Sequence, residues 1–177
     1  MSPLKKYLPH YTIADYRRWE GEWELWAGIA VSMSPSPFGP HQKMLAEFSY
    51  RIISAMREQD CDQCEVLVEC DWIISDDTVL RPDLAIVCGT TTERHIEQTP
   101  TLIIEILSDS TREKDQTAKR DRYAAEGVMH YILCETDDQT ITRLQRTPTG
   151  VYEDQTGANT SVTLHPGCYL PADTFRV

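Results

Sequence analysis

The run Thr101-Leu-Ile-Ile-Glu-Ile-Leu107 decides how the rest of the chain is arranged. It is almost wholly apolar and rich in branched residues, which is typical of a central strand buried on both faces of a sheet. One carboxylate, that of Glu105, interrupts the run. An unpaired carboxylate is costly to bury, so a partner must hold Glu105 charged or the environment must keep it protonated.

A second carboxylate lies on the preceding predicted strand, where Asp83 follows Pro82. If the two strands are neighbours, Asp83 and Glu105 project to one point at the sheet. Mg²⁺ takes oxygen ligands, often one or two carboxylates completed by water and substrate phosphate. A shared divalent cation is therefore one explanation of the buried Glu105. A core Arg, Lys or Tyr partner is the other, and the strand pattern alone does not choose between them.

Three helices are predicted around these strands. Apolar residues recur at spacings of three and four between His41 and Glu58, which predicts the longest helix. Capping-box patterns begin the other two, one at Thr12 and one at Ser110. The helix that follows Ser110 is expected to end at Gly127, a typical residue after a helix C-terminus.

The remaining segments predict strands, turns and one loop. Ala27-Gly28 predicts the turn of a hairpin over 23–33, and the prolines of 34–40 predict a loop. Pro82 indicates an edge, a bulge or a strand start. Further strands are predicted at 65–74, 79–88, 128–134, 140–146, 151–153 and 161–164, with a turn at Asp76-Asp77. This order predicts one α/β domain over 1–177, a mixed central sheet flanked by helices with extra β-hairpins.

Composition narrows the class of protein. The chain has 177 residues, 41% of them hydrophobic, as in a globular domain. Its 17 Lys+Arg and 28 Asp+Glu give a net charge of -11, which argues against non-specific coating of nucleic acid. A carboxylate cluster that binds a divalent cation remains compatible with this charge. No apolar run reaches the ~18 residues of a membrane helix and no export signal is recognised, so we expect a cytoplasmic protein without membrane contact.

Six cysteines are present, and a reducing compartment is expected for them. Cys70, Cys88 and Cys134 lie in apolar strand-like runs and are predicted to be small core residues. Cys61 and Cys64 form a CxxC pair. A structural zinc site takes four ligands, usually from a second pair at matching spacing, and the sequence has no second pair. The pair is expected in a surface loop, with a zinc site as the alternative.

Taken in order, the motifs resemble the Uma-type family of restriction endonucleases, within the PD-(D/E)XK nuclease superfamily. The resemblance covers roughly residues 12–147. No single motif is specific, whereas the ordered set is. The matching pieces are Trp23-Glu-Leu-Trp-Ala-Gly28, His41, Arg81-Pro-Asp-Leu-Ala-Ile-Val87, Leu102-Ile-Ile-Glu-Ile-Leu-Ser108, Ser110-Thr111, Lys119, Tyr123, Gly127-Val128 and Tyr131.

The resemblance implies a restriction-endonuclease-like fold and metal-dependent cleavage of phosphodiester bonds. Asp83 and Glu105 would bind Mg²⁺, or Mn²⁺ in its place. Glu24 and His41 would lie at the rim of the site. Glu24 would be a candidate further ligand, and His41 a ligand, a proton carrier or a phosphate contact. Tyr123 is expected to serve core packing.

Two departures from the superfamily pattern bear on the site. The residue two positions after Glu105 is Leu107, where the superfamily places a lysine. The Uma-type pattern takes this lysine from the next helix, and Lys119 matches it. If that helix returns along the sheet, Lys119 comes back alongside Glu105; the alternative is a surface ion pair with Asp115. Asp109 adds a charge to the loop near the site.

These observations support a Mg²⁺-dependent nuclease that acts on DNA, expected as a homodimer because cutting two strands suits two-fold symmetry. The competing hypothesis is a nuclease-fold protein that binds or assembles without cutting, favoured by the acidic charge and the missing strand lysine. A hydrolase with a Ser108 or cysteine nucleophile lacks the expected elbow motif. The cations at 112, 114, 120 and 122 form either a solvated face or a strip that meets a phosphate backbone.

Overall fold

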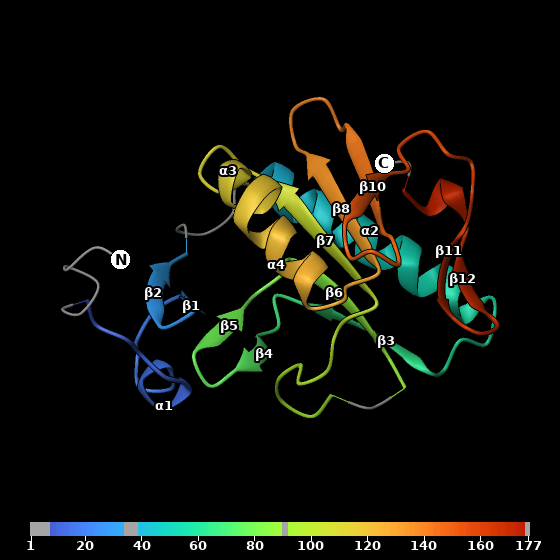
Figure 1. The fold of residues 1–177 in the computed structure, drawn as a ribbon. Coiled ribbons are helices and arrows are strands. Elements are labelled where there is room, and N and C mark those ends of the chain that lie inside the picture. Colours follow the sequence, from blue (N-terminus) through green and yellow to red (C-terminus); the bar gives the residue numbers. More distant parts are fainter. Residues whose placement is uncertain (1–7, 34–38, 90–91, 176–177) are drawn as a thin grey trace.

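The computed structural model describes residues 8–33, 39–89 and 92–175. Its largest element is a six-stranded sheet with the order β10-β9-β8-β7-β6-β3 (Figure 1). Strand β7 runs parallel to β8 and antiparallel to β6, so the sheet is mixed. The bounds are β3 (Cys64–Val68), β6 (Leu84–Cys88), β7 (Leu102–Leu107), β8 (His130–Glu135), β9 (Ile141–Arg146) and β10 (Tyr152–Asp154).

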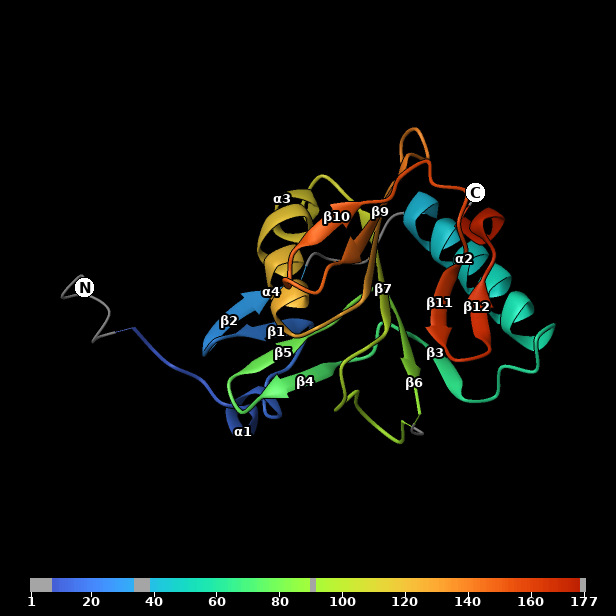
Figure 2. The same ribbon diagram turned by 45° about the vertical axis from the view of Figure 1, so that its right-hand side comes forward.

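Strand β7 is buried on both faces, as its sequence predicts. Its even-numbered residues join the core beneath α2 (Gly39–Arg57), whereas Ile103 and Leu107 join the core beneath α4 (Arg120–Ala125). Figure 2 shows the two helices on opposite sides of the sheet. Because side chains alternate along a strand, Glu105 faces α4. The predicted central strand is therefore confirmed.

The predicted helices are present, with different boundaries. In α1 (Ile13–Tyr16) the Asp15 carboxylate accepts hydrogen bonds from the N–H and hydroxyl of Thr12. The helix predicted to begin at Ser110 instead has Thr111 as its N-cap residue. It consists of α3 (Arg112–Lys114), a π-helical turn η2 (Asp115–Lys119) and α4.

A second sheet has the order β2-β1-β5-β4 and contains the predicted hairpin around Ala27-Gly28. Its strands are β1 (Trp23–Trp26), β2 (Ile29–Ser32), β4 (Trp72–Ser75) and β5 (Thr78–Leu80). The predictions of single strands over 65–74 and 79–88 are wrong, because each segment crosses from one sheet to the other. Glu69, at φ 48°, and Pro82 lie at these crossings. Strand propensity is similar in both sheets and does not reveal the change.

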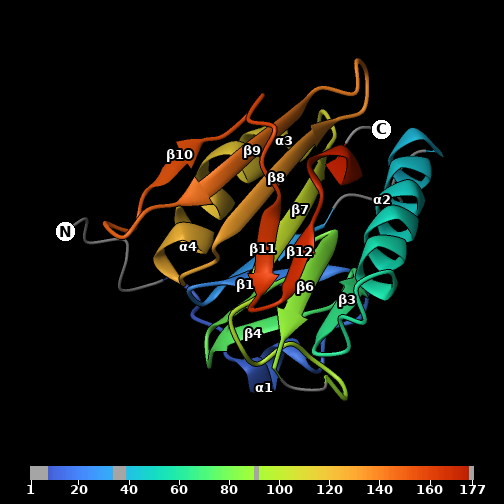
Figure 3. The ribbon, with the colours of Figure 1, turned by 90° about the vertical axis from the view of Figure 1, so that its right-hand side faces the viewer.

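Chain ends and loops complete the fold. The predicted loop over 34–40 is shorter, since α2 begins at Gly39, and 34–38 lie outside the described residues. Pro40 is tolerated in the first helical turn, where its missing N–H has no partner to lose. Hairpin β11 (Val162–His165) and β12 (Cys168–Leu170), followed by η3 (Ala172–Phe175), packs on the α2 face of the sheet (Figure 3). Among the described helices, none is long and apolar enough to cross a membrane.

The cysteines differ most from expectation. Cys88 is bonded to Cys64, and Cys61 to Cys168, so Cys88 is not a simple core residue. Cys64 is buried at the start of β3, and the pair is therefore not confined to a surface loop. Cys134 is a fully buried free thiol, as predicted, and Cys70 is free and half-buried. Sequence spacing missed these pairings because the partners lie on separate elements.

Candidate active site

The register of β6 against β7 brings the two predicted metal ligands together. Leu84 lies opposite Ile104, so the residues next to them, Asp83 and Glu105, also lie side by side. The Asp83 N–H donates to Glu105 Oε2 at 3.4 Å. The antiparallel pairing of β6 and β7 therefore brings the two carboxylates together, as the sequence predicted.

Lys119 extends from the π-helical turn into the same site. Its side chain is 6% exposed, and its Nζ lies 3.0 Å from Glu105 Oε1, 3.3 Å from Glu24 Oε1 and 3.5 Å from Asp115 Oδ1. Both sequence alternatives for Lys119 are thus realised together, although the ion pair with Asp115 is buried and not on the surface. One ammonium group is shared by three carboxylates.

The π-helical turn gives this arrangement its local geometry. Such turns are rare and occur frequently at functional sites. Here the turn spans Asp115–Lys119, and both of its end residues are buried toward the sheet. The sequence predicted for Asp115 only a surface ion pair with Lys119. The available signal was its position four residues before Lys119.

Tyr123 combines packing with a contact to the site. Its ring stacks on Trp72 with centroids 5.9 Å apart, and its hydroxyl donates to Glu105 Oε1 at 2.7 Å. The expected packing role is present, and the hydrogen bond is an addition that the sequence pattern did not indicate. Glu105 therefore has the Lys and Tyr partners that were the alternative to a cation, while its Oε2 points toward Asp83.

Glu24 lies in the buried wall of the site and not at its rim. It is 1% exposed on β1. Its Oε1 accepts the backbone N–H of Arg81 at 2.8 Å, and its Oε2 accepts the indole N–H of Trp26 at 3.0 Å. With Lys119 also at Oε1, these contacts suit Glu24 to holding the lysine and the β5–β6 connection.

His41 reaches the site from the first turn of α2. Its Nε2 lies 3.2 Å from Asp83 Oδ2, the oxygen that also accepts the N–H of Ile106 at 2.7 Å. The His41 side chain is 10% exposed, and Nδ1 is buried without a hydrogen-bond partner among the described residues. The Asp83 hydrogen bond and charge outweigh burial and raise the pKa of His41.

Charge is unevenly balanced in this cluster. Glu24, Asp83, Glu105 and Asp115 surround one lysine. Burial, together with the nearby Asp115 and Asp83 charges, raises the pKa of Glu105 well above its usual range despite the opposing Lys119. Burial also raises the pKa of Asp115. Burial works to lower the pKa of Lys119, but the surrounding carboxylates, Glu105 foremost, raise it well above its ordinary value.

A pocket of about 50 Å³ opens at the cluster, lined by all five predicted site residues together with Asp115 and Lys114. This volume accommodates an ion and a water molecule, since water occupies ~30 Å³ in the liquid. The oxygen donors of Asp83 and Glu105 fit a hard divalent cation such as Mg²⁺. Surplus negative charge and the unpartnered His41 Nδ1 also fit a site that receives a further polar group.

The predicted cationic strip is only partly free. Arg112 forms ion pairs with Glu135 and Asp109, and Arg122 pairs with Glu126 at 3.0 Å. Of these cations, Lys114 is the one that lines the pocket.

Comparison with known families bears on this geometry. The model of the Uma2 family, described as "putative restriction endonuclease", matches residues 13–173. The chain belongs to the Uma2 family. Its fold resembles the crystal structure of a "putative nuclease belonging to DUF820" from Anabaena variabilis, with a TM-score of 0.71, 17% identity, and coverage of 93% of this chain and 96% of that one. A comparison with curated proteins finds no match.

Membership in Uma2 confirms the resemblance that the ordered motifs indicated. At 17% identity the solved structure shows the fold alone, and it confirms the nuclease-like mixed α/β class. Family and fold together support a nuclease.

Proposed function

We propose that this Uma2 protein is a metal-dependent endonuclease that hydrolyses phosphodiester bonds of DNA. The observation that carries the proposal is the meeting of Asp83 and Glu105 beside a buried lysine, in a pocket where carboxylates outnumber cations. Asp83 and Glu105 would hold Mg²⁺, or Mn²⁺ in its place. A divalent cation supplies Lewis-acid polarisation of phosphoryl oxygens and lowers the pKa of water.

The side chains divide the remaining tasks. Lys119 would orient the attacking water and stabilise negative charge on the phosphate. Tyr123 and Lys119 fix the orientation of Glu105 through its Oε1, so that Oε2 would be the oxygen available to a cation. His41 and the Ile106 N–H fix Asp83 through Oδ2. Glu24 and Asp115 hold the ammonium of Lys119 in place.

We further propose that the enzyme acts as a homodimer, because two active sites related by two-fold symmetry suit the two strands of a duplex. Lys114, which lines the pocket, would contact phosphate. The net charge of -11 makes a local contact of this kind more important, since the molecule as a whole repels DNA.

One observation favours a second candidate, a nuclease-fold protein that binds or assembles without cutting. Glu105 Oε1 already accepts two donors, and Lys119 already faces three carboxylates. A cluster paired in this way can be stable without a metal. Direct measurement of Mg²⁺ binding by calorimetry separates the candidates, because the second one predicts none at Asp83 and Glu105.

The deciding experiment is cleavage of supercoiled plasmid and of labelled duplex oligonucleotides with Mg²⁺ or Mn²⁺, stopped by EDTA. The Asp83→Asn variant should be inactive. Glu47→Gln serves as its matched control, because Glu47 is a half-exposed carboxylate of α2 that pairs with Arg51. No cleavage of any DNA, together with no Mg²⁺ binding at Asp83 and Glu105, would reject the nuclease and leave the binding protein; equal activity of wild type and Asp83→Asn would reject the assigned site.

A further inference from the structure

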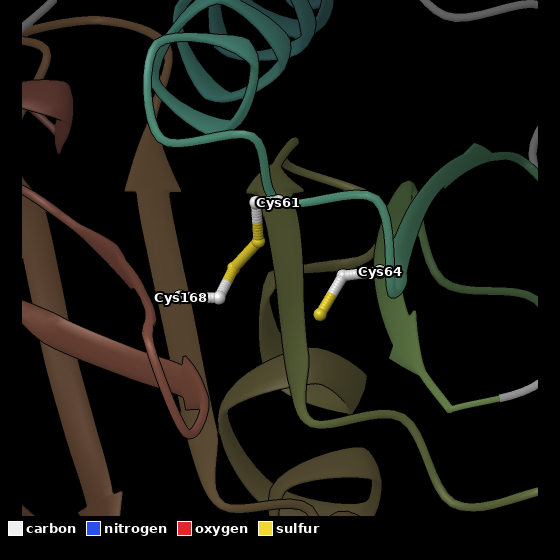
Figure 4. A group of neighbouring side chains, drawn as sticks. All are labelled: Cys61, Cys64 and Cys168. Carbon is white, nitrogen blue, oxygen red and sulfur yellow. A yellow bond between two sulfur atoms is a disulfide. The ribbon is translucent and has the colours of Figure 1, made fainter.

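Four cysteines from three separate parts of the chain converge at the far end of β6. Sulfur atoms of Cys61, Cys64 and Cys168 lie within 4.8 Å of one another, and Cys88 is bonded to Cys64. Figure 4 shows Cys64 beside the Cys61–Cys168 bridge. Among the described residues, the first three form the only group of three or more metal-ligating side chains with such close ligand atoms. Two disulfides can each stabilise a fold without lying next to each other, so their proximity calls for a further explanation.

Backbone hydrogen bonds place these residues without help from the sulfur atoms. The Cys61 N–H donates to Met56 O at 3.0 Å, which fixes the turn after α2. The Gly89 N–H donates to Gln63 O at 2.8 Å and holds the neighbours of Cys88 and Cys64 together.

A side-chain amide does the same for the other pair. Gln59 donates from Nε2 to Tyr169 O at 2.7 Å and accepts the Tyr169 N–H at 3.2 Å. These bonds join the segments next to Cys61 and Cys168. The fold therefore brings four thiols together whether or not they are oxidised.

We propose that, in the reduced protein, Cys61, Cys64, Cys88 and Cys168 form a structural zinc site. Cys61-Asp-Gln-Cys64 has the ligand spacing of a zinc knuckle, and four thiolates complete a closed tetrahedral site. A tetrahedron with Zn–S bonds of ~2.3 Å has sulfur atoms ~3.8 Å apart. The sulfur atoms of Cys61, Cys64 and Cys168 all lie within 4.8 Å of one another, so small side-chain movements after reduction suffice to reach that separation. The third and fourth ligands come from distant positions, and spacing rules could not supply them.

Zinc and the two disulfides are alternative states of the same four sulfur atoms. Reduction of both disulfides by a dithiol takes four electrons, breaks two S–S bonds and gives four thiols. Binding of Zn²⁺ then releases four protons and leaves a unit of charge -2. The ion would join the end of α2, strand β3, strand β6 and the C-terminal hairpin through one centre.

This site is separate from the candidate active site. Cys88 ends β6, whereas Asp83 precedes its first residue, so the two lie ~16 Å apart along the strand. The ligand chemistry also differs, because soft thiolates select zinc and hard carboxylates select Mg²⁺. Variants at one site should therefore leave metal binding at the other unchanged.

The test uses the full chain purified with a dithiol reductant and without chelator. We expect about one zinc per chain by elemental analysis, and retention of this zinc in Asp83→Asn. Replacement of zinc by Co²⁺ should give the intense thiolate-to-cobalt charge-transfer bands and visible bands of a tetrahedral site, which oxygen ligands do not give. Fully reduced protein that takes up no zinc, or cobalt bands typical of oxygen ligands only, would overturn the proposal.

Ligand variants assign the site residue by residue. Cys88→Ser and Cys168→Ser should each lose zinc, whereas Cys70→Ser, at a free and half-buried thiol, should keep it. If a ligand variant fails to fold, cobalt spectra of the wild-type protein still decide the question. Zinc content equal in Cys88→Ser and wild type would reject Cys88 as a ligand and with it the four-thiolate site.

Discussion

The two ends of strand β6 each carry a cluster of reactive side chains, and the two clusters are held together in different ways. At one end Asp83 joins three other carboxylates around Lys119. At the other end Cys88 joins three sulfur atoms within a mainly apolar core. The carboxylate groups depend on Lys119 for charge balance, whereas the cysteines are positioned by backbone hydrogen bonds and apolar packing.

This difference suits the carboxylate cluster to catalysis and the cysteine cluster to the stability of the fold. A cluster with surplus charge and an open pocket is suited to receiving an ion and a phosphate, and it stores unfavourable electrostatic energy while empty. A neutral cluster packed beneath α2 and the C-terminal hairpin serves mainly to hold the fold together. Substitutions at the carboxylate end should consequently reduce activity more than stability.

The largest effect is expected from neutralising either predicted metal ligand. Asp83→Asn and Glu105→Gln should each lower the rate of metal-dependent DNA cleavage by about 10³-fold or more, because Mg²⁺ gives up its waters reluctantly and needs both carboxylates. The free energy of unfolding without metal should stay within about 1 kcal/mol or rise, since one of four crowded charges is removed. Gel-based cleavage rates and urea unfolding measure the two quantities. Unfolding of Glu105→Gln would make Glu105 a structural partner instead.

Lys119→Met should reduce both activity and stability, unlike the substitutions of the carboxylates. Loss of the ammonium group that pairs with Glu24, Glu105 and Asp115 should cost about 3 kcal/mol of stability without metal, as for other broken buried ion pairs. Turnover should fall by about 10²–10³-fold through lost charge stabilisation. Thermal unfolding with and without Mg²⁺ checks this, and Mg²⁺ should raise the melting temperature more in the variant than in wild type.

Lys114→Met, which removes the second lysine that lines the pocket, is the control for Lys119→Met. It should weaken DNA binding and leave stability nearly unchanged. A Lys119→Met protein as stable and as active as the control would show that Lys119 is dispensable to the cluster.

The stability of the protein should fall in acid because of His130, which contacts the C-terminal hairpin. Burial lowers the pKa of His130 to about 4, and its Nε2 lies 3.2 Å from Thr163 O in the C-terminal hairpin. Because the unfolded value is near 6.5, the neutral histidine stabilises the fold fully above pH 6.5. That contribution is lost as the pH falls toward 4, where the unfolded chain binds a proton that the native protein does not.

The expected loss for His130 is roughly 2–3 kcal/mol between pH 7 and pH 4. His130→Gln keeps a donor for Thr163 O but does not titrate, so its stability should fall less over the same range. Urea unfolding at several pH values measures the difference between the two proteins. His165→Gln, in the same hairpin, is the matched control, and identical pH dependence of wild type and His130→Gln would refute the assignment.

Sequence reasoning reached those parts of both regions that a local pattern encodes. The apolar run around Glu105 predicted β7, and the spacing of Met44, Phe48 and Ile52 predicted α2. The family resemblance selected Lys119, and the helix does return it to Glu105.

Patterns that depend on the third dimension were missed. The chain changes sheets at Glu69 and Pro82 without a change in strand propensity. The π-helical turn that buries Asp115 has no periodic signature. Cys168 lies 107 residues from Cys61, so no spacing rule could join them. In each case the deciding interaction is between segments that are distant in sequence.

The smallest expected effect, and the finest test of the comparison, comes from two buried tyrosines. Tyr123 donates to the Glu105 carboxylate at 2.7 Å, whereas its neighbour Tyr131 donates to the backbone carbonyl of Asp115 at 2.9 Å. Tyr123→Phe and Tyr131→Phe each remove one buried hydrogen bond and should lower stability by a similar amount, about 1–2 kcal/mol. Their consequences for catalysis should differ.

The hydrogen bond from Tyr123 is one of the contacts that oppose the raised pKa of Glu105. Its removal in Tyr123→Phe should raise the pKa of Glu105 further. The carboxylate then ionises at higher pH, and the acid limb of the pH–rate profile shifts to higher pH. The rate below the midpoint should fall by up to about tenfold, while Tyr131→Phe keeps the wild-type profile. Cleavage rates measured across pH for both variants check this. Parallel profiles for the two variants would show that Tyr123 serves packing alone, and the carboxylate end of β6 would then depend on Lys119 without a contribution from the aromatic core.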